Sequence, residues 1–215
     1  MKPIILICGT PHSFTSMVSK FLIDNGGECP DTWDNPKWDM TYERYESKKI
    51  QEYLKQKRKF KDENLTDFFK SLPIDKVITL KAPLLIYHIN DILKFTDRQL
   101  KVVFVNRNPQ DIILSSMEKS GKSFIYYYER IIWIYNFLIN AELPVHMLIS
   151  ERLFKRDIHT AKALLEYCEL YNGSINFESI DMKKTKVRRP TYLKYRFSNF
   201  LWKRLSKLFR IYDVK

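Results

Sequence analysis

The sequence predicts an α/β fold with three layers, α/β/α, around a central and mostly parallel β-sheet. Short apolar runs alternate with longer segments whose apolar residues recur every three or four positions, as strands alternate with helices. The chain has 215 residues, 45% of them hydrophobic and 29% charged, which suits one such domain with a real core. Successive strands joined by helices favour parallel pairing and right-handed crossovers.

The expected elements follow in chain order from these two periodicities. Strands are expected at short apolar runs: 3–8, 76–80, 101–106 and 145–149. Helices are expected where apolar residues have helical spacing: 14–25, 43–60, 64–71, 84–95, 109–120, 123–141 and 157–171. The stretch 24–42 is irregular, and a loop of this length in a small domain is often functional. The pattern leaves the strand order open, but ligands of such sheets bind at the carboxyl ends of the strands.

The first strand runs directly into a turn that opens the first helix, which is how a chain builds an anion-binding cradle. The spacing is that of a phosphate loop, G-x-x-x-x-G-K-[ST], so the fold is expected to be like that of phosphate-loop nucleotide triphosphatases. Phe14 stands at the second Gly and Thr15 at the Lys. The missing Lys disfavours ATP or GTP chemistry and favours a phosphate ligand that is not a Mg-bound triphosphate. The alternative for Ser13, Thr15 and Ser16 is that they only cap the helix.

A second strand–turn–helix segment contains Arg107, Pro109 and Ser115. Pro109 suits a first helical position. Arg107 ends the strand, and its guanidinium is suited to a forked contact with phosphate, to which Ser115 adds a hydroxyl.

Together the two segments resemble the sulfotransferase superfamily, which uses 3′-phosphoadenosine 5′-phosphosulfate. The family patterns are roughly G-x-P-[RK]-S-G-T-[ST] and [VI]-x-R-[ND]-P-x-D-x-x-x-S. The chain matches them at Gly9, Pro11, Ser13, Thr15 and Ser16, and at Arg107, Asn108, Pro109, Asp111 and Ser115. Weaker matches at 34–37, 80–83 and 148–153 are similar to segments of the bacterial members. The resemblance covers about residues 3–170, with the motifs in the expected order.

The resemblance implies a sulfotransferase that depends on 3′-phosphoadenosine 5′-phosphosulfate (PAPS). Such an enzyme moves a sulfuryl group to a hydroxyl or amine acceptor and uses no metal. The residues implied to cradle the 5′-phosphosulfate form the first loop: Gly9, Thr10, Pro11, His12, Ser13, Phe14, Thr15 and Ser16. Arg107 and Ser115 are implied to hold the 3′-phosphate. Arg188 and Arg189 are candidates for the basic segment with which the family closes this pocket. A carbohydrate or a small hydroxyl compound would suit as acceptor.

Three residues are candidates for catalysis. Lys81 is the candidate for stabilising charge on the leaving phosphate oxygen. His12 stands where the family has Arg or Lys and is a candidate phosphosulfate ligand or base, and Glu43 is a second candidate base. The bland alternatives are a solvent-exposed Lys81, a turn-capping His12 and an exposed helix-start Glu43. Because Lys81 and His12 are expected outside the apolar core, we expect their alanine variants to melt at nearly the same temperature as the wild type.

The C-terminal stretch differs in composition from the rest. Between residues 183 and 210 there are eleven Lys or Arg and no Asp or Glu, with apolar residues at helical spacing. We therefore divide the chain into an α/β domain, 1–182, and a basic amphipathic segment, 183–215. The first expectation for this segment is packing on the same domain, and contact with an anionic membrane surface is the alternative.

The net charge of +12 suits an anionic ligand. The three Cys lack disulfide or zinc spacing, and we expect no signal peptide or transmembrane segment, so a reducing, cytoplasmic location is expected.

Two rival functions remain open: a degenerate phosphate-loop kinase, and a non-catalytic protein that binds a nucleotide or nucleic acid on the same fold. No nucleic-acid-binding motif is present, so nucleic acid is not the expected partner. The oligomeric state is not predicted.

Overall fold

A computed structural model describes residues 1–10, 13–31, 46–56, 62–109, 111–113 and 124–181. Its centre is a four-stranded sheet in the order β2-β1-β3-β4. The strands are β1 (Ile4–Gly9), β2 (Ile78–Lys81), β3 (Leu100–Asn106) and β4 (Val145–Ile149). Every pairing is parallel. The predicted parallel sheet is therefore confirmed, and each strand begins and ends within two residues of its predicted bounds.

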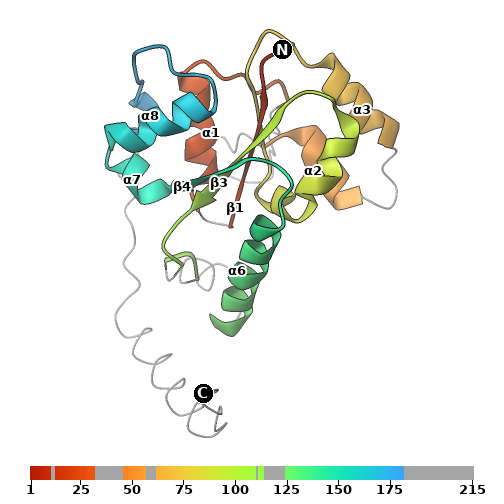
Figure 1. Cartoon of the computed structure of the whole chain (residues 1–215). Coiled ribbons are helices and arrows are strands. Elements are labelled where there is room, and N and C mark those ends of the chain that lie inside the picture. The colour runs from red at the N-terminus through yellow and green to blue at the C-terminus, as the bar shows by residue number, and fades with distance from the viewer. Residues whose placement is uncertain (11–12, 32–45, 57–61, 110, 114–123, 182–215) are drawn as a thin grey trace, which may run out of the picture. The chain divides into compact units, whose positions relative to one another are not determined.

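Helices cover both faces of this sheet, as Figure 1 shows. The α-helices are α1 (Thr15–Asp24), α2 (Lys48–Gln56), α3 (Asp62–Ser71), α4 (Ile89–Ile92), α6 (Phe124–Ile139), α7 (Ser150–Phe154), α8 (Ile158–Tyr167) and α9 (Glu178–Asp181). Two 3₁₀ helices flank α4: η1 (Pro83–His88) and η2 (Leu93–Phe95). The α/β/α prediction is confirmed.

The alternation of side chains along the strands divides the core between the two faces. Ile4, Leu6 and Cys8 of β1 belong to the cluster under α2, α3, η1, α4 and α6. Ile5 and Ile7 belong to the cluster under α1, α7, α8 and α9. All five side chains are fully buried, which explains why β1 is a continuous apolar run rather than an alternating one.

Several helix predictions need correction. The segment 84–95 is three short helices rather than one, because the 3₁₀ turn that starts at Pro83 ends at His88, whose φ of −135° is not helical. The helix predicted at 157–171 ends at Tyr167, and Glu169 takes a positive φ of 58°. α7 and α9 were not expected. The helix predicted at 43–60 is described over 46–56, where residues 46 and 47 are not helical and α2 begins at Lys48. Of the helix predicted at 109–120 only 109 and 111–113 are described, all helical.

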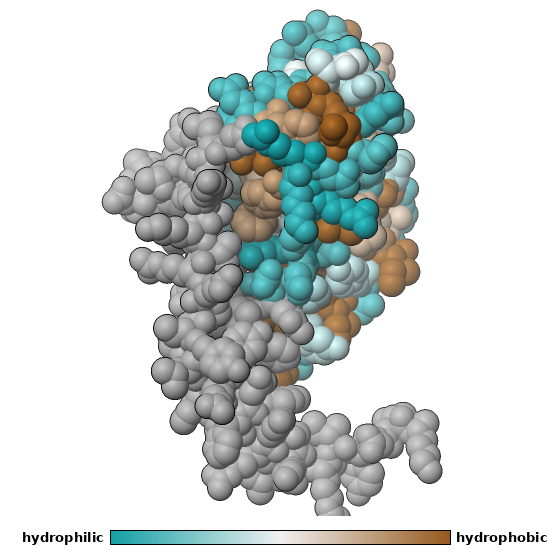
Figure 2. All heavy atoms as spheres, turned by 90° about the vertical axis from the view of Figure 1, so that its left-hand side faces the viewer, coloured by the Kyte–Doolittle hydropathy of each residue, from teal (hydrophilic) through white to brown (hydrophobic). Residues whose placement is uncertain are grey.

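The helix α6 is less buried than its apolar sequence suggests. Tyr127, Ile131 and Ile134 are buried, but Tyr128 is 51% and Trp133 is 63% exposed. One face of α6 is thus buried and the other is exposed. On the side of α7 and α8, the described surface is mostly hydrophilic with separate hydrophobic spots (Figure 2).

Arg98 fixes the edge of the sheet at which β1 begins. This side chain is 7% exposed and donates hydrogen bonds to the carbonyl oxygens of Lys2, Pro73 and Lys76. Burial lowers the pKa of its guanidinium. These contacts join the segments that precede β1, β2 and β3, so the amino ends of these strands are tied together. The carboxyl ends remain for a ligand.

No helix in the described part of the chain is long and apolar enough to span a bilayer. The predicted division at residue 182 and the basic segment 183–215 lie outside the described residues.

Candidate functional site

The strand register brings the sequence motifs together at the carboxyl ends of the strands. β1 lies between β2 and β3, with Ile7 opposite Lys81 and Gly9 opposite Val105. Gly9, Lys81 and Arg107 therefore stand at, or directly after, the carboxyl ends of three adjacent strands. This edge is where parallel α/β sheets bind their ligands.

The loop after β1, residues 9–16, is called the Gly9 loop below. A Cβ on Gly9 would lie 2.6 Å from the carbonyl oxygen of Val105 and 2.7 Å from Ser13 Oγ, so no larger residue fits at the base of this loop. The Ser13 N–H donates to the Thr10 carbonyl at 3.1 Å and closes the turn. Pro11 and His12 lie outside the described residues.

Two hydroxyl groups of the Gly9 loop are buried and unsatisfied. Thr10 is 2% and Ser13 is 0% exposed, and within the described chain neither Thr10 Oγ1 nor Ser13 Oγ has a hydrogen-bond partner. Buried polar groups normally have partners, so these two require an explanation such as a bound group. No side chain caps α1, so the capping alternative for Ser13 is not observed.

Phe14, which stands where the resembled pattern has Gly, takes a left-handed backbone conformation. Its φ and ψ are 68° and 25°, and its carbonyl accepts hydrogen bonds from the N–H groups of Met17 and Val18 at the start of α1. A non-Gly residue in this region costs about 1–3 kcal/mol. The left-handed conformation at Phe14 is therefore kept at the expense of strain.

Lys81 points into the site from the end of β2. Its Nζ lies 2.9 Å from Ser16 Oγ, in the first turn of α1, and 3.1 Å from Glu46 Oε1. The residue is 2% exposed, and the Glu46 side chain is 14% exposed. The alternative of a solvent-exposed Lys81 is wrong. The expectation that Lys81 lies outside the core is wrong as well. Removing a buried cation that has a carboxylate partner costs stability.

Glu46 is an acidic residue of the site that the sequence analysis missed. The predicted base, Glu43, lies outside the described residues. Glu46 precedes Ser47, whose N–H donates to the Lys81 carbonyl at 2.9 Å. Asp31 Oδ2 accepts from Ser47 Oγ at 2.8 Å and from the Lys49 N–H at 2.9 Å, which fixes the start of α2 beside β2. Burial raises the pKa of Asp31, although these hydrogen bonds oppose the shift.

Arg107 follows β3 on the other side of the Gly9 loop. Its guanidinium lies 4.4 Å from the centre of the Phe14 ring, and one of its nitrogens is 3.6 Å from Asp111 Oδ2. The side chain is 12% exposed. The next N–H, of Asn108, donates to Glu151 Oε1 at 2.8 Å. The other predicted phosphate ligands, Ser115, Arg188 and Arg189, lie outside the described residues.

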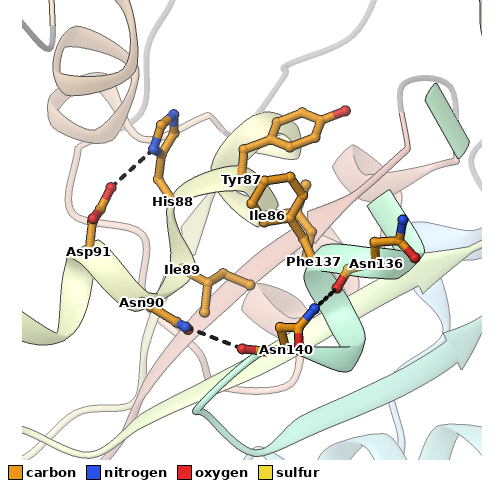
Figure 3. A pocket seen from close by; sticks show the side chains of 9 residues that line it. All are labelled: Ile86, Tyr87, His88, Ile89, Asn90, Asp91, Asn136, Phe137 and Asn140. Atoms are coloured by element: carbon orange, nitrogen blue, oxygen red, sulfur yellow. Dashed lines mark hydrogen bonds and ion pairs between the residues drawn. The ribbon is translucent and has the colours of Figure 1, made fainter. Parts of the chain in front are cut away.

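A hollow of about 370 Å³ lies elsewhere, between η1, α4 and α6, and Figure 3 shows its lining. Asn90 Nδ2 donates to the Asn140 carbonyl, and His88 Nδ1 is 3.1 Å from Asp91 Oδ2. This hollow shares no residue with the Gly9 loop, Lys81 or Arg107, so it is separate from the site that the sequence motifs predict. Among the described residues, no group of three or more His, Cys, Asp or Glu is placed to hold a metal ion.

Comparisons with known proteins place the chain by its fold. No family model and no curated protein sequence matches it. Among solved structures it is similar to the "Sulfotransferase Domain from the Synechococcus PCC 7002 Olefin Synthase", with a TM-score of 0.56, 13% identity, and coverage of 90% of this chain and 82% of that one. The "Sulfotransferase Domain from the Curacin Biosynthetic Pathway" aligns with a TM-score of 0.42 and 15% identity over 79% of this chain and 74% of that one. By its similarity to the first of these structures, the chain has a sulfotransferase-like fold.

Proposed function

We propose that this protein is a sulfotransferase that moves a sulfuryl group from 3′-phosphoadenosine 5′-phosphosulfate to a hydroxyl or amine acceptor. One observation carries the proposal: in a sulfotransferase-like fold, the Gly9 loop, Lys81 and Arg107 converge at the carboxyl ends of three adjacent strands. These are two cations and a helix N-terminus around one edge, a combination suited to a ligand with several anionic groups.

The residues present fit such a donor. Thr10 Oγ1 and Ser13 Oγ are buried hydroxyls without partners in the described chain, and each can donate to a phosphosulfate oxygen. The missing side chain at Gly9 allows the loop to close tightly. In this proposal the Gly9 loop holds the phosphosulfate, and Arg107 and Ser115 hold the 3′-phosphate. Arg188 and Arg189 would close the pocket.

Lys81 would assist the departure of the phosphate. When bound, the donor supplies an activated sulfur–oxygen bond, whose bridging oxygen gains negative charge as the bond breaks. Lys81 offers a cation at the Gly9 loop, and Glu46 and Ser16 hold that cation in one direction before the ligand arrives. Preorganised charge of this kind is usually the largest catalytic contribution.

The acceptor must also lose its proton to a base, and His12, Glu43 and Glu46 compete for that role. In the described structure a Glu46 carboxylate oxygen lies 3.1 Å from Lys81 Nζ, so this side chain is already engaged in an ion pair. A His12→Arg variant separates the two roles of His12, since Arg supplies charge but accepts no proton near neutral pH. Retained turnover would exclude His12 as an essential base and favour Glu43.

Binding of adenosine 3′,5′-bisphosphate, the desulfated donor, tests the proposal directly. Isothermal titration should give tighter binding of the bisphosphate than of AMP, ADP or ATP. Arg107→Ala should remove most of that preference, because a hydrogen bond to a charged group is worth about 1.5–3 kcal/mol. Lys162→Ala, which lowers the net charge equally on α8, should retain it. Equal affinity of the wild type for AMP and the bisphosphate would contradict the proposal.

Transfer itself distinguishes an enzyme from a non-catalytic binder. Release of adenosine 3′,5′-bisphosphate from the donor should require an acceptor, and a panel of carbohydrates and small alcohols would identify its class. Tight bisphosphate binding without release for any acceptor would favour the non-catalytic alternative.

A further inference from the structure

Phe14 joins the two anion-binding elements of the site. Its ring lies against the Arg107 guanidinium, 4.4 Å from ring centre to the central carbon, and meets the Phe154 ring edge-on at 4.5 Å and 78°. An aromatic face attracts a cation most strongly where water is excluded, and the Arg107 side chain is 12% exposed. The N–H groups of a guanidinium lie in its plane, so a ring against one face leaves them directed outward.

The position of Phe14 is unusual for a bulky residue. It stands at the start of α1 with φ of 68°, a conformation that Gly adopts without strain. An aromatic side chain at such a position persists only where its surroundings compensate for the strain. The observed compensation is contact with Arg107 on the β3 side and with Phe154 of α7.

The same region of α7 fixes Arg107 a second time. Glu151 Oε1 accepts a hydrogen bond from the Asn108 N–H at 2.8 Å, directly after Arg107. Ile112 and Ile113 pack against Tyr127 and Ile131 of α6, which anchors the far end of the turn. The backbone that follows Arg107 is therefore held by Glu151 and α6, whereas its guanidinium contacts Asp111 and Phe14.

From these contacts we infer that Phe14 is a positioning residue for Arg107, which holds the guanidinium toward the 3′-phosphate of the nucleotide. The inference rests on the proposed function, because it assigns Phe14 a share in the preference for a 3′-phosphate. The side chain makes this contribution from the loop that cradles the 5′ end, so the two ends of the ligand are recognised by one contiguous unit. Phe14 itself touches no reacting atom.

The test measures the preference for adenosine 3′,5′-bisphosphate over AMP in four variants by isothermal titration. Phe14→Leu keeps bulk but loses the aromatic face, and we expect the preference to fall about fivefold. Phe14→Gly removes ring and strain together and should lose the preference to the same extent while folding readily. Phe14→Tyr keeps the ring and should keep the preference. Phe177→Leu is the matched control, because it removes a ring that packs on Phe21, 5.9 Å away, rather than on Arg107.

The ratio of affinities separates positioning from packing. A merely structural role would weaken both nucleotides equally in Phe14→Leu, and that result would overturn the inference. An unchanged preference in Phe14→Leu and Phe14→Gly would overturn it as well, while a wild-type preference for the bisphosphate would leave the proposed function standing. A wild type without any such preference would instead overturn the proposed function and, with it, the role of Phe14.

Discussion

The Lys81→Met variant should be less stable than the wild type and should also have a lower turnover. Met keeps most of the apolar stem but removes the ammonium, which leaves Glu46 without the cation 3.1 Å away and Ser16 Oγ without its donor at 2.9 Å. Breaking a buried pair from one side costs about 3–5 kcal/mol. Because the Glu46 side chain is 14% exposed and some water reaches it, we expect about 3 kcal/mol, or a melting temperature lowered by about 6–12 °C for a chain of this size.

Urea unfolding of a double-mutant cycle is the assay. Glu46→Gln in the Lys81→Met background removes the unpaired charge, so the double variant should recover most of the lost free energy of unfolding. Its turnover should stay as low as that of Lys81→Met, because the cation at the Gly9 loop is still missing. A Lys81→Met variant within 1 kcal/mol of the wild type, or a double variant no more stable than the single one, would refute the buried-pair reasoning.

Further predictions concern the metal, the histidine of β4 and the thiols. Turnover should be unchanged by a chelator, since the Gly9 loop lacks the Lys that accompanies a Mg-bound triphosphate; activity restored only by Mg²⁺ would favour a kinase. Burial lowers the pKa of His146, so the folded state resists protonation there and stability should fall as pH drops below about 6.5; a His146→Gln variant should lose less melting temperature between pH 7.5 and 5.5 than the wild type. Burial raises the pKa of Cys29 to about 11 and of Cys168 to about 12 and also raises that of Cys8, so iodoacetamide at pH 7.5 should label all three only after unfolding, as mass spectrometry would detect.

The strands could be predicted because buried strands consist almost entirely of apolar residues. β1 and β3 are covered on both faces, so they are nearly continuous runs of Ile, Leu, Val and Phe that no amphipathic helix would have. The strand order could not be predicted, since parallel pairing joins segments far apart in the sequence. Arg98 illustrates the same limit: it donates to three carbonyls from two separate segments, and neither segment is adjacent to it in the chain.

The placement of Gly9, Lys81 and Arg107 at one end of the sheet could be predicted, because each residue ends a strand or directly follows one. Glu46 could not, because it belongs to no motif and reaches Lys81 only through the way Asp31 and Ser47 fix the start of α2. The contact between Phe14 and Arg107 was likewise invisible, since periodicity carries no information on which side chains of two loops meet. The departure from the resembled pattern at Phe14 was the available signal, and it did not indicate the contact with Arg107.

The central place of β1 has a consequence for how the protein is made. β1 is the first strand of the chain, yet both of its neighbours, β2 and β3, come much later. Pairings between such distant segments form slowly, because each must close a long loop before it gains any contact. The Gly9 loop therefore precedes both of its partner strands in the chain and acquires its shape only once residues through Asn106 have followed. A nucleotide bound to this loop as proposed would bind only the completed sheet, and its concentration would raise the folded fraction of the protein by mass action.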